Sequence, residues 1–110
     1  MSKIKSRAQR ATIALVKTFH VGLIVNNLDG KMCAVGTIQT LKDRLYEETM
    51  RAKNPNWDST PLRDAIRVSG EQNFSVKTVL STIDKNAGLL LKKSLIVQHK
   101  LNDPQYGYNS

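Results

Sequence analysis

Two neighbouring segments determine the predicted fold: Pro61-Leu62-Arg63-Asp64-Ala65-Ile66-Arg67 and Gly70-Glu71-Gln72-Asn73-Phe74-Ser75-Val76. Thr60 precedes them as a helix N-cap, and Pro61 suits the first helical turn, where its missing N–H is not needed. Gly70 tolerates the positive φ at which many helices end. The first segment therefore predicts a helix that stops at Gly70. Its apolar residues are Leu62, Ala65, Ile66 and Val68.

Strand signals lie on both sides of this helix. Phe74–Thr82 alternates along its length, which predicts a strand with one buried face. The residues expected on that face are Phe74, Val76, Thr78 and Leu80. Two further strands are predicted at His20–Asn26 and Lys31–Thr37, joined by turn residues that include Gly30. We expect these two strands to form an antiparallel hairpin.

Three more helices are expected. Thr40 is an N-cap with Asp43 in the usual acidic position, so a helix should run from Leu41 to about Ala52. Its expected buried residues are Leu41, Leu45 and Met50. Lys85–Lys100 predicts a final helix, and Ile4–Val16 predicts a first one. The apolar residues of the final helix are Leu89, Leu90, Leu91, Leu95 and Ile96.

These elements predict an α/β domain of the α+β kind, with a small central three-stranded antiparallel sheet flanked by helices. The domain should occupy residues 20–110. Residues 1–19 are expected to form a basic helix or arm packed on it. The sequence shows no internal repeat, low-complexity tract or linker that would indicate a second domain.

Charge and cysteine content narrow the class of protein. The net charge of +8 favours a polyanionic partner such as nucleic acid. Cys33 is the only cysteine, so neither an internal disulfide nor a cysteine-based zinc site is expected. No apolar run is long enough to span a bilayer. We therefore expect an intracellular, cytoplasmic protein with no cofactor and no membrane partner.

Several short motifs occur in the order found in one nuclease superfamily. Gly22-Leu23-Ile24, Asp29-Gly30-Lys31 and Ala34-Val35-Gly36 follow one another, and Leu41 and Arg44 come five and eight residues after Gly36. The chain ends in Gly107-Tyr108-Asn109 before its last residue. Together with the segments quoted first, this order and spacing resembles the GIY-YIG endonuclease superfamily over residues 20–109. The resemblance implies the GIY-YIG fold, and the superfamily's frequency in phage genomes implies a phage origin, which would place the protein in the host cytoplasm.

The resemblance also implies that the catalytic set is lost. Members cleave a phosphodiester with one divalent metal held by a late-helix glutamate, helped by two motif tyrosines and an arginine. Ile24 and Ala34 stand at the two tyrosine positions, Glu48 stands where members often have His or Tyr, and Lys92 stands at the metal glutamate. Only Arg44 remains. The segment 85–102 contains no Asp or Glu, and a hard cation prefers carboxylate oxygens. We expect no metal site and no nuclease activity by the family mechanism.

Basic residues on two helices are the candidates for binding. They are Lys42, Arg44, Arg51, Lys53, Lys92 and Lys93. In the resembled fold both helices face the cleft, which would then hold a phosphate backbone without cutting it. Arg44 has an alternative role as a surface residue paired with Glu47 or Glu48. Trp57, in a polar loop, could stack on a base or anchor the loop over the core.

Three functions remain open. The first is a non-catalytic, nucleic-acid-binding pseudo-nuclease, with DNA favoured as its ligand. The second is a protein-interaction module or inhibitor, for example a phage host-takeover or anti-defence factor, with an unidentified protein as partner. The third is a divergent metal-dependent DNA endonuclease that uses carboxylates such as Asp58, Asp64 or Asp103. The sequence does not indicate an oligomeric state.

Overall fold

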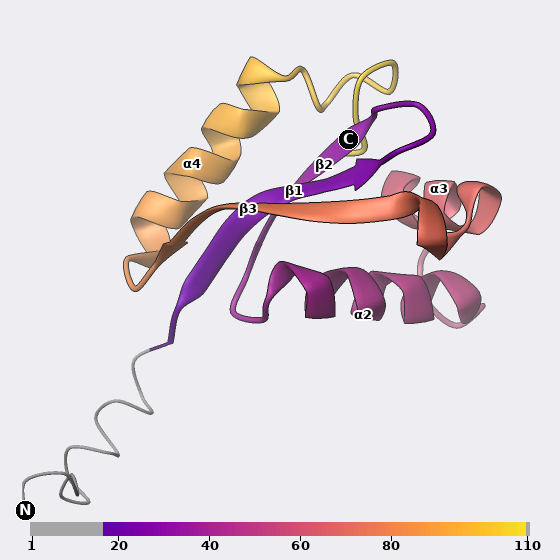
Figure 1. Ribbon diagram of the computed structural model, residues 1–110, viewed down its shortest axis with the longest axis horizontal. Coiled ribbons are helices and arrows are strands. Elements are labelled where there is room, and N and C mark those ends of the chain that lie inside the picture. The colour runs from indigo at the N-terminus through magenta and orange to yellow at the C-terminus, as the bar shows by residue number, and fades with distance from the viewer. Residues whose placement is uncertain (1–16, 110) are drawn as a thin grey trace, which may run out of the picture.

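The computed structural model describes residues 17–109 of the chain (Figure 1). Its elements are β1 (Phe19–Asn26), β2 (Met32–Thr37), α2 (Leu41–Lys53), α3 (Pro61–Ser69), the short 3₁₀ helix η1 (Glu71–Asn73), β3 (Phe74–Thr82) and α4 (Lys85–Gln98). The expected helix Ile4–Val16 lies outside the described residues, as does nearly all of the basic arm. Within residues 17–109, no helix has both the length and the apolar character needed to cross a membrane.

The three strands form one antiparallel sheet in the order β2-β1-β3. The central strand β1 pairs with both neighbours, so that Ile24 lies opposite Cys33 on one side and Val76 on the other. The predicted α+β class and the three-stranded antiparallel sheet are confirmed. β1 is almost wholly buried, as a central strand covered on both faces should be.

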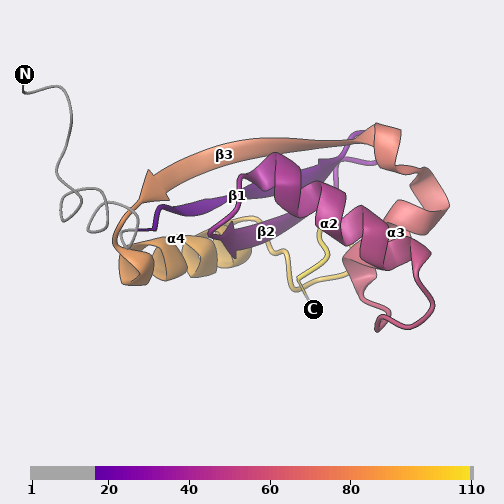
Figure 2. The same cartoon turned by 90° about the horizontal axis from the view of Figure 1, so that it is seen from below.

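Helices cover both faces of the sheet (Figures 1 and 2). α2 and α3 cover one face, and the core between them and the sheet is centred on Ile24, Leu41 and Phe74. α4 covers the other face, over a second core that includes Val21 and Leu95. The sheet therefore separates two hydrophobic cores.

The helix ends follow the local signals. Thr40 Oγ1 accepts a hydrogen bond from the Asp43 N–H at 3.1 Å, and Thr60 Oγ1 accepts one from the Arg63 N–H at 3.2 Å. Gly70 ends α3 with φ +87°. These caps confirm the predicted starts of α2 and α3 and the predicted end of α3.

The predicted alternation of β3 is wrong at Leu80, which was expected on the face of Phe74. The pairing with β1 shifts register between Val21 and Gly22, so that Gly22 lies opposite Thr78 whereas Val21 lies opposite Leu80. Opposed residues in antiparallel strands share a face. The bulge therefore moves Leu80 to the side of Val21, towards α4.

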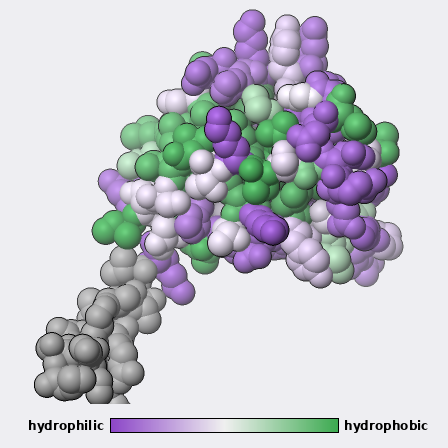
Figure 3. All heavy atoms as spheres, in the orientation of Figure 1, coloured by the Kyte–Doolittle hydropathy of each residue, from purple (hydrophilic) through white to green (hydrophobic). Residues whose placement is uncertain are grey.

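Several apolar residues of the helices are exposed, including Met50, whose predicted burial is wrong. Val68 has 87 % of its surface exposed and Leu90 has 67 %, and Met50 and Leu89 are also exposed. The helix sides that face the sheet are already filled, for example by Leu95 in α4. Hydrophobic residues gather on the surface over α4 and the adjoining sheet, whereas hydrophilic residues dominate over α3 (Figure 3).

The C-terminal tail lies along the outer edge of β2. Gly107 forms an isolated parallel bridge with Met32. Beyond it, the side chain of Asn109 accepts a hydrogen bond from the Ala34 N–H at 2.7 Å and donates one to the Ala34 carbonyl at 2.9 Å. Asn109 thus pairs with the strand edge as a neighbouring peptide group would.

Candidate functional site

A pocket of about 410 Å³ lies where β2, α2, the start of α3, α4 and the tail meet. It is called the Arg44 pocket below. Its lining residues are Cys33, Ala34, Val35, Arg44, Glu48, Ser59, Thr60, Pro61, Leu62, Arg63, Lys92, Tyr108 and Asn109. Three of these side chains are cationic and one is a carboxylate, so the lining has an excess of positive charge.

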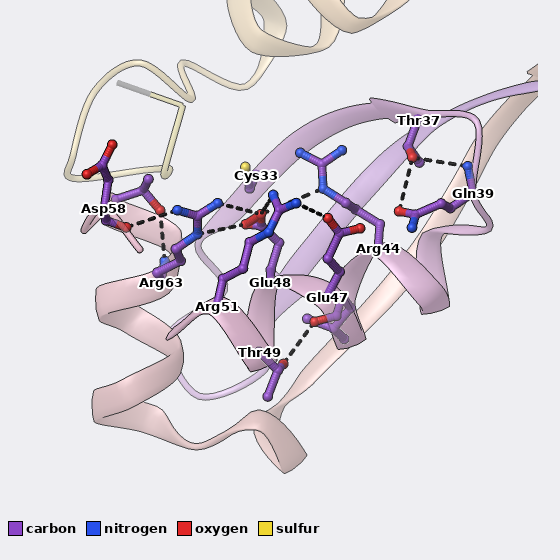
Figure 4. A network of polar contacts seen from close by, with 12 residues as sticks. Cys33, Thr37, Gln39, Arg44, Glu47, Glu48, Thr49, Arg51, Asp58 and Arg63 are labelled. Carbon is purple, nitrogen blue, oxygen red and sulfur yellow. Dashed lines mark hydrogen bonds and ion pairs between the residues drawn. The ribbon is translucent and has the colours of Figure 1, made fainter. Parts of the chain in front are cut away.

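Glu48 is the carboxylate, and arginines surround it (Figure 4). Its Oε1 lies 3.1 Å from Arg63 Nη2, 3.7 Å from Arg44 Nε and 3.9 Å from Arg51 Nη1. Its Oε2 accepts a hydrogen bond from Arg63 Nε at 3.3 Å. Glu48 is only 4 % exposed, so this buried charge requires the cations that face it.

The arginines still have donors beyond those that Glu48 engages. In Arg44 it is Nε that faces Glu48, at a distance longer than a hydrogen bond, and this buried atom has no hydrogen-bond partner among residues 17–109. Arg63 uses Nε and Nη2 for Glu48, and its Nη1 donates to the Asp58 carbonyl at 2.9 Å. A guanidinium has five N–H donors, so donors remain for an anionic ligand.

The pocket also affects the one cysteine. Burial raises the pKa of the Cys33 thiol to about 11, although the positive charges of Lys92 and Arg44 act in the opposite direction. Cys33 is 7 % exposed and is packed in the core beside α2. It is therefore a protonated thiol at neutral pH.

The structure brings together most of the positions singled out by the resemblance. Ala34, Arg44, Glu48 and Lys92 all line the Arg44 pocket. Ile24 does not line it, because the side chain is fully buried in the core beneath α2. The ion pair between Arg44 and Glu48, one of the two roles predicted for this arginine, is present.

Three of the predicted basic residues, Lys42, Lys53 and Lys93, do not line the pocket. A helix turns by about 100° per residue, so Lys42 and Lys53 lie on roughly the opposite side of α2 from Arg44. Lys53 instead pairs with Glu71, with 3.2 Å between Nζ and Oε1. Lys93 lines a separate hollow on α4 with Leu90 and Val97.

Arg51 and Trp57 form a second site beside the first. The Arg51 guanidinium lies 4.3 Å from the centre of the Trp57 ring, and that of Arg63 lies 5.9 Å from it. A hollow of about 580 Å³ is lined by Glu47, Met50, Arg51, Lys53, Asn54, Pro55 and Trp57. It is called the Trp57 hollow below. Trp57 is 47 % exposed, so its ring is partly available to a ligand.

Two participants in the pocket were not predicted from the sequence. Arg63 belongs to the segment that determines the fold, but its role as the main partner of Glu48 was missed. The available signal was a charged residue next to the buried Leu62 on an amphipathic helix. Asn109 was noted only as part of the terminal Gly107-Tyr108-Asn109 motif, and nothing in its local sequence indicates that it reaches Ala34.

The carboxylates proposed for a divergent metal site do not line the Arg44 pocket. Asp64 is an exposed α3 residue that pairs with Arg67 at 2.5 Å. Asp103 lies in the tail, where its Oδ1 accepts a hydrogen bond from the Gln105 N–H. In the part of the chain that the structure describes, no three His, Cys, Asp or Glu residues are grouped so that they could hold a metal ion.

The chain was compared with models of protein families, with curated proteins and with solved structures. None of the three comparisons finds a match. The resemblance to GIY-YIG endonucleases therefore stays a prediction from the motifs quoted above.

Proposed function

We propose that the protein binds nucleic acid without cleaving it and that the Arg44 pocket holds a backbone phosphate. The observation behind the proposal is the grouping of Arg44, Arg63 and Lys92 around one pocket with a single carboxylate, Glu48. Guanidinium groups match phosphate oxygens in charge and in geometry, and a lysine adds a point charge. Such contacts supply most of the affinity of proteins that bind nucleic acid without regard to sequence.

The charge of the whole chain supports the same class of ligand. The net charge is +8, and Lys3, Lys5, Arg7 and Arg10 contribute half of it. A positive potential of this kind raises the rate of encounter with a polyanion. The pocket supplies the local contacts, and the remaining charges favour association in general.

The lack of cleavage is part of the proposal. Metal-assisted hydrolysis requires oxygen ligands that are free to bind a cation. The only carboxylate that lines the pocket is Glu48, and both of its oxygens face arginines. Lys92 adds a positive charge that would repel a metal ion. The resemblance to GIY-YIG endonucleases fits this proposal, since three of the four altered positions, Ala34, Glu48 and Lys92, line the pocket.

The proposal is tested by fluorescence anisotropy with a labelled oligonucleotide over a series of salt concentrations. The logarithm of the affinity should fall linearly with the logarithm of the salt concentration. Arg44→Ala and Lys92→Ala should each weaken binding by about tenfold and lower the salt slope by about one contact. Absence of binding at low salt would overturn the proposal.

Lys42→Ala is the matched control, because it removes one positive charge from the far side of the same helix as Arg44. Its affinity should stay within about twofold of the original protein, since an exposed charge that touches no phosphate contributes only through the general field. If Lys42→Ala weakens binding as much as Lys92→Ala does, the affinity arises from net charge and the pocket is not the site. Circular dichroism establishes that each variant is folded.

Cleavage is tested separately with supercoiled plasmid and either Mg²⁺ or Mn²⁺. The plasmid should remain supercoiled at protein concentrations that saturate binding. Metal-dependent nicking that Asp64→Asn abolishes would contradict the non-catalytic part of the proposal and favour the divergent endonuclease.

A further inference from the structure

The Trp57 hollow has the composition of a site for a flat, apolar ring. Its walls include the indole of Trp57, the thioether of Met50 and the ring of Pro55. Both Trp57 and Met50 are about half exposed, at 47 % and 48 %. Polar groups suited to the edge of a ring, such as the amide of Asn54, lie around them.

Two arginines connect this hollow to the Arg44 pocket. Arg51 lines the hollow, stacks against Trp57 and reaches within 3.9 Å of Glu48 Oε1. Arg63 lines the pocket and lies 5.9 Å from the same indole. Arg51 is also held by an ion pair with Glu47, which limits the freedom of its guanidinium. The aromatic ring and the phosphate-binding cations are thus adjacent and mutually supported.

We infer that the preferred ligand is a single-stranded nucleic acid, one of whose bases stacks in the Trp57 hollow while a neighbouring phosphate lies in the Arg44 pocket. This inference rests on the proposed function, because it assumes that the pocket holds a phosphate. It adds a second contact of a different chemical kind. Stacking on an aromatic side chain accepts any base, so the site should distinguish unpaired from paired nucleotides more than one sequence from another.

A duplex does not present an exposed base face to the Trp57 hollow. In a double helix both faces of each base are covered by its neighbours, so a protein must unstack and unpair a base before it can bind either face. A single strand exposes its bases at lower cost. Stacking contributes about 1–3 kcal/mol per base, which corresponds to roughly five- to 150-fold in affinity.

The test compares a short oligothymidine with a strand of the same length in which the central nucleotides are abasic. Both strands have the same phosphate charge, so they differ only in what the Trp57 hollow can hold. Trp57 is the only tryptophan of the chain, and its intrinsic fluorescence reports directly on the hollow. We expect the intact strand to quench this fluorescence and to bind at least about five times more tightly than the abasic strand.

Variants at the hollow provide a second measurement. Trp57→Ala should reduce binding of the intact strand to the level of the abasic strand while leaving the salt slope unchanged, because no phosphate contact is removed. Trp57→Phe should retain a large part of the preference. Tyr46→Ala is the matched control, since Tyr46 is an aromatic residue that is 64 % exposed but lines neither the hollow nor the Arg44 pocket. It should bind as the original protein does.

The outcomes separate the inference from the proposed function. Equal affinity for intact, abasic and duplex ligands, with unchanged Trp57 fluorescence, would overturn the inference and leave the phosphate pocket standing. No binding of any of the three at low salt would overturn both. If Trp57→Ala does not fold, the comparison of the intact and abasic strands on the unaltered protein decides the question alone.

Discussion

The Glu48 carboxylate on α2 accepts two hydrogen bonds from the Arg63 guanidinium on α3, at 3.1 Å and 3.3 Å. Both side chains are buried, with 6 % and 10 % of their surface exposed. The pair fixes the position of α3 against α2 and at the same time sets the orientation of the arginine that lines the pocket. The Arg44 pocket, where we propose that a phosphate binds, and the packing of α3 on α2 therefore depend on the same contact.

Glu48→Gln should lower the free energy of unfolding by about 3 kcal/mol, because it leaves the charge of Arg63 buried without a counter-charge. The measurement is urea denaturation followed by circular dichroism. Glu47→Gln is the control: Glu47 is a neighbouring carboxylate that pairs with Arg51 in a half-buried position and should cost less than about 1 kcal/mol. An equal decrease in the free energy of unfolding of the two variants would mean that the buried pair contributes no more to stability than the half-buried one.

Asn109→Ala should destabilise the protein by about 1–3 kcal/mol, because it leaves the N–H and carbonyl of Ala34 without their partners, and Ala34 is only 1 % exposed. Amide hydrogen exchange at Ala34 should become faster in the variant. Asn102→Ala, in an exposed part of the same tail, should change the free energy of unfolding by less than about 0.5 kcal/mol. Unchanged exchange at Ala34 would contradict the role assigned to Asn109.

The stability of the protein should fall as the pH rises from about 9 to about 11. The Cys33 thiol has a pKa raised to about 11 by burial, compared with its ordinary value of 9.0 in an unfolded chain. Between these values the unfolded chain releases the thiol proton and the folded chain keeps it, so rising pH favours unfolding by up to about 1.4 kcal/mol per unit of pKa difference.

The contribution of Cys33 is isolated by comparison with Cys33→Ala, since other groups also titrate in this range. Below about pH 8 the difference in free energy of unfolding between the two proteins should be constant. Above about pH 8, the free energy of unfolding of the original protein should fall steadily relative to that of Cys33→Ala. Parallel pH profiles up to about pH 11 would show that the thiol titrates in the folded state as it does in the unfolded one.

Local features of the fold could be predicted from the sequence because they depend on neighbouring residues. The caps at Thr40 and Thr60 and the end of α3 at Gly70 each follow from a few adjacent positions. The hairpin of β1 and β2 follows from two apolar runs and the turn between them. In each case the residues that make the contact are close together in the chain.

Features that depend on how distant elements meet could not be predicted. The bulge between β1 and β3 belongs to the pairing of two strands far apart in the chain, and periodicity within β3 does not reveal it. The same holds for the contact of Glu48 with Arg63 and for that of Asn109 with Ala34. In α4, Leu95 is buried whereas Leu90 is exposed, and the run of leucines does not show which of them face the sheet.

The two neighbours of β1 differ greatly in how far away they are in sequence. The hairpin with β2 begins with Val25 opposite Met32, whereas β3 brings Thr82 opposite Phe19. The cost of closing a loop grows with its length, so we expect the hairpin to form before the β1–β3 pairing. Until β3 docks, one edge of β1, the central strand of the finished sheet, has no hydrogen-bonding neighbour. The slow step of folding, and the moment of greatest risk of association between nascent chains, should therefore be the arrival of β3.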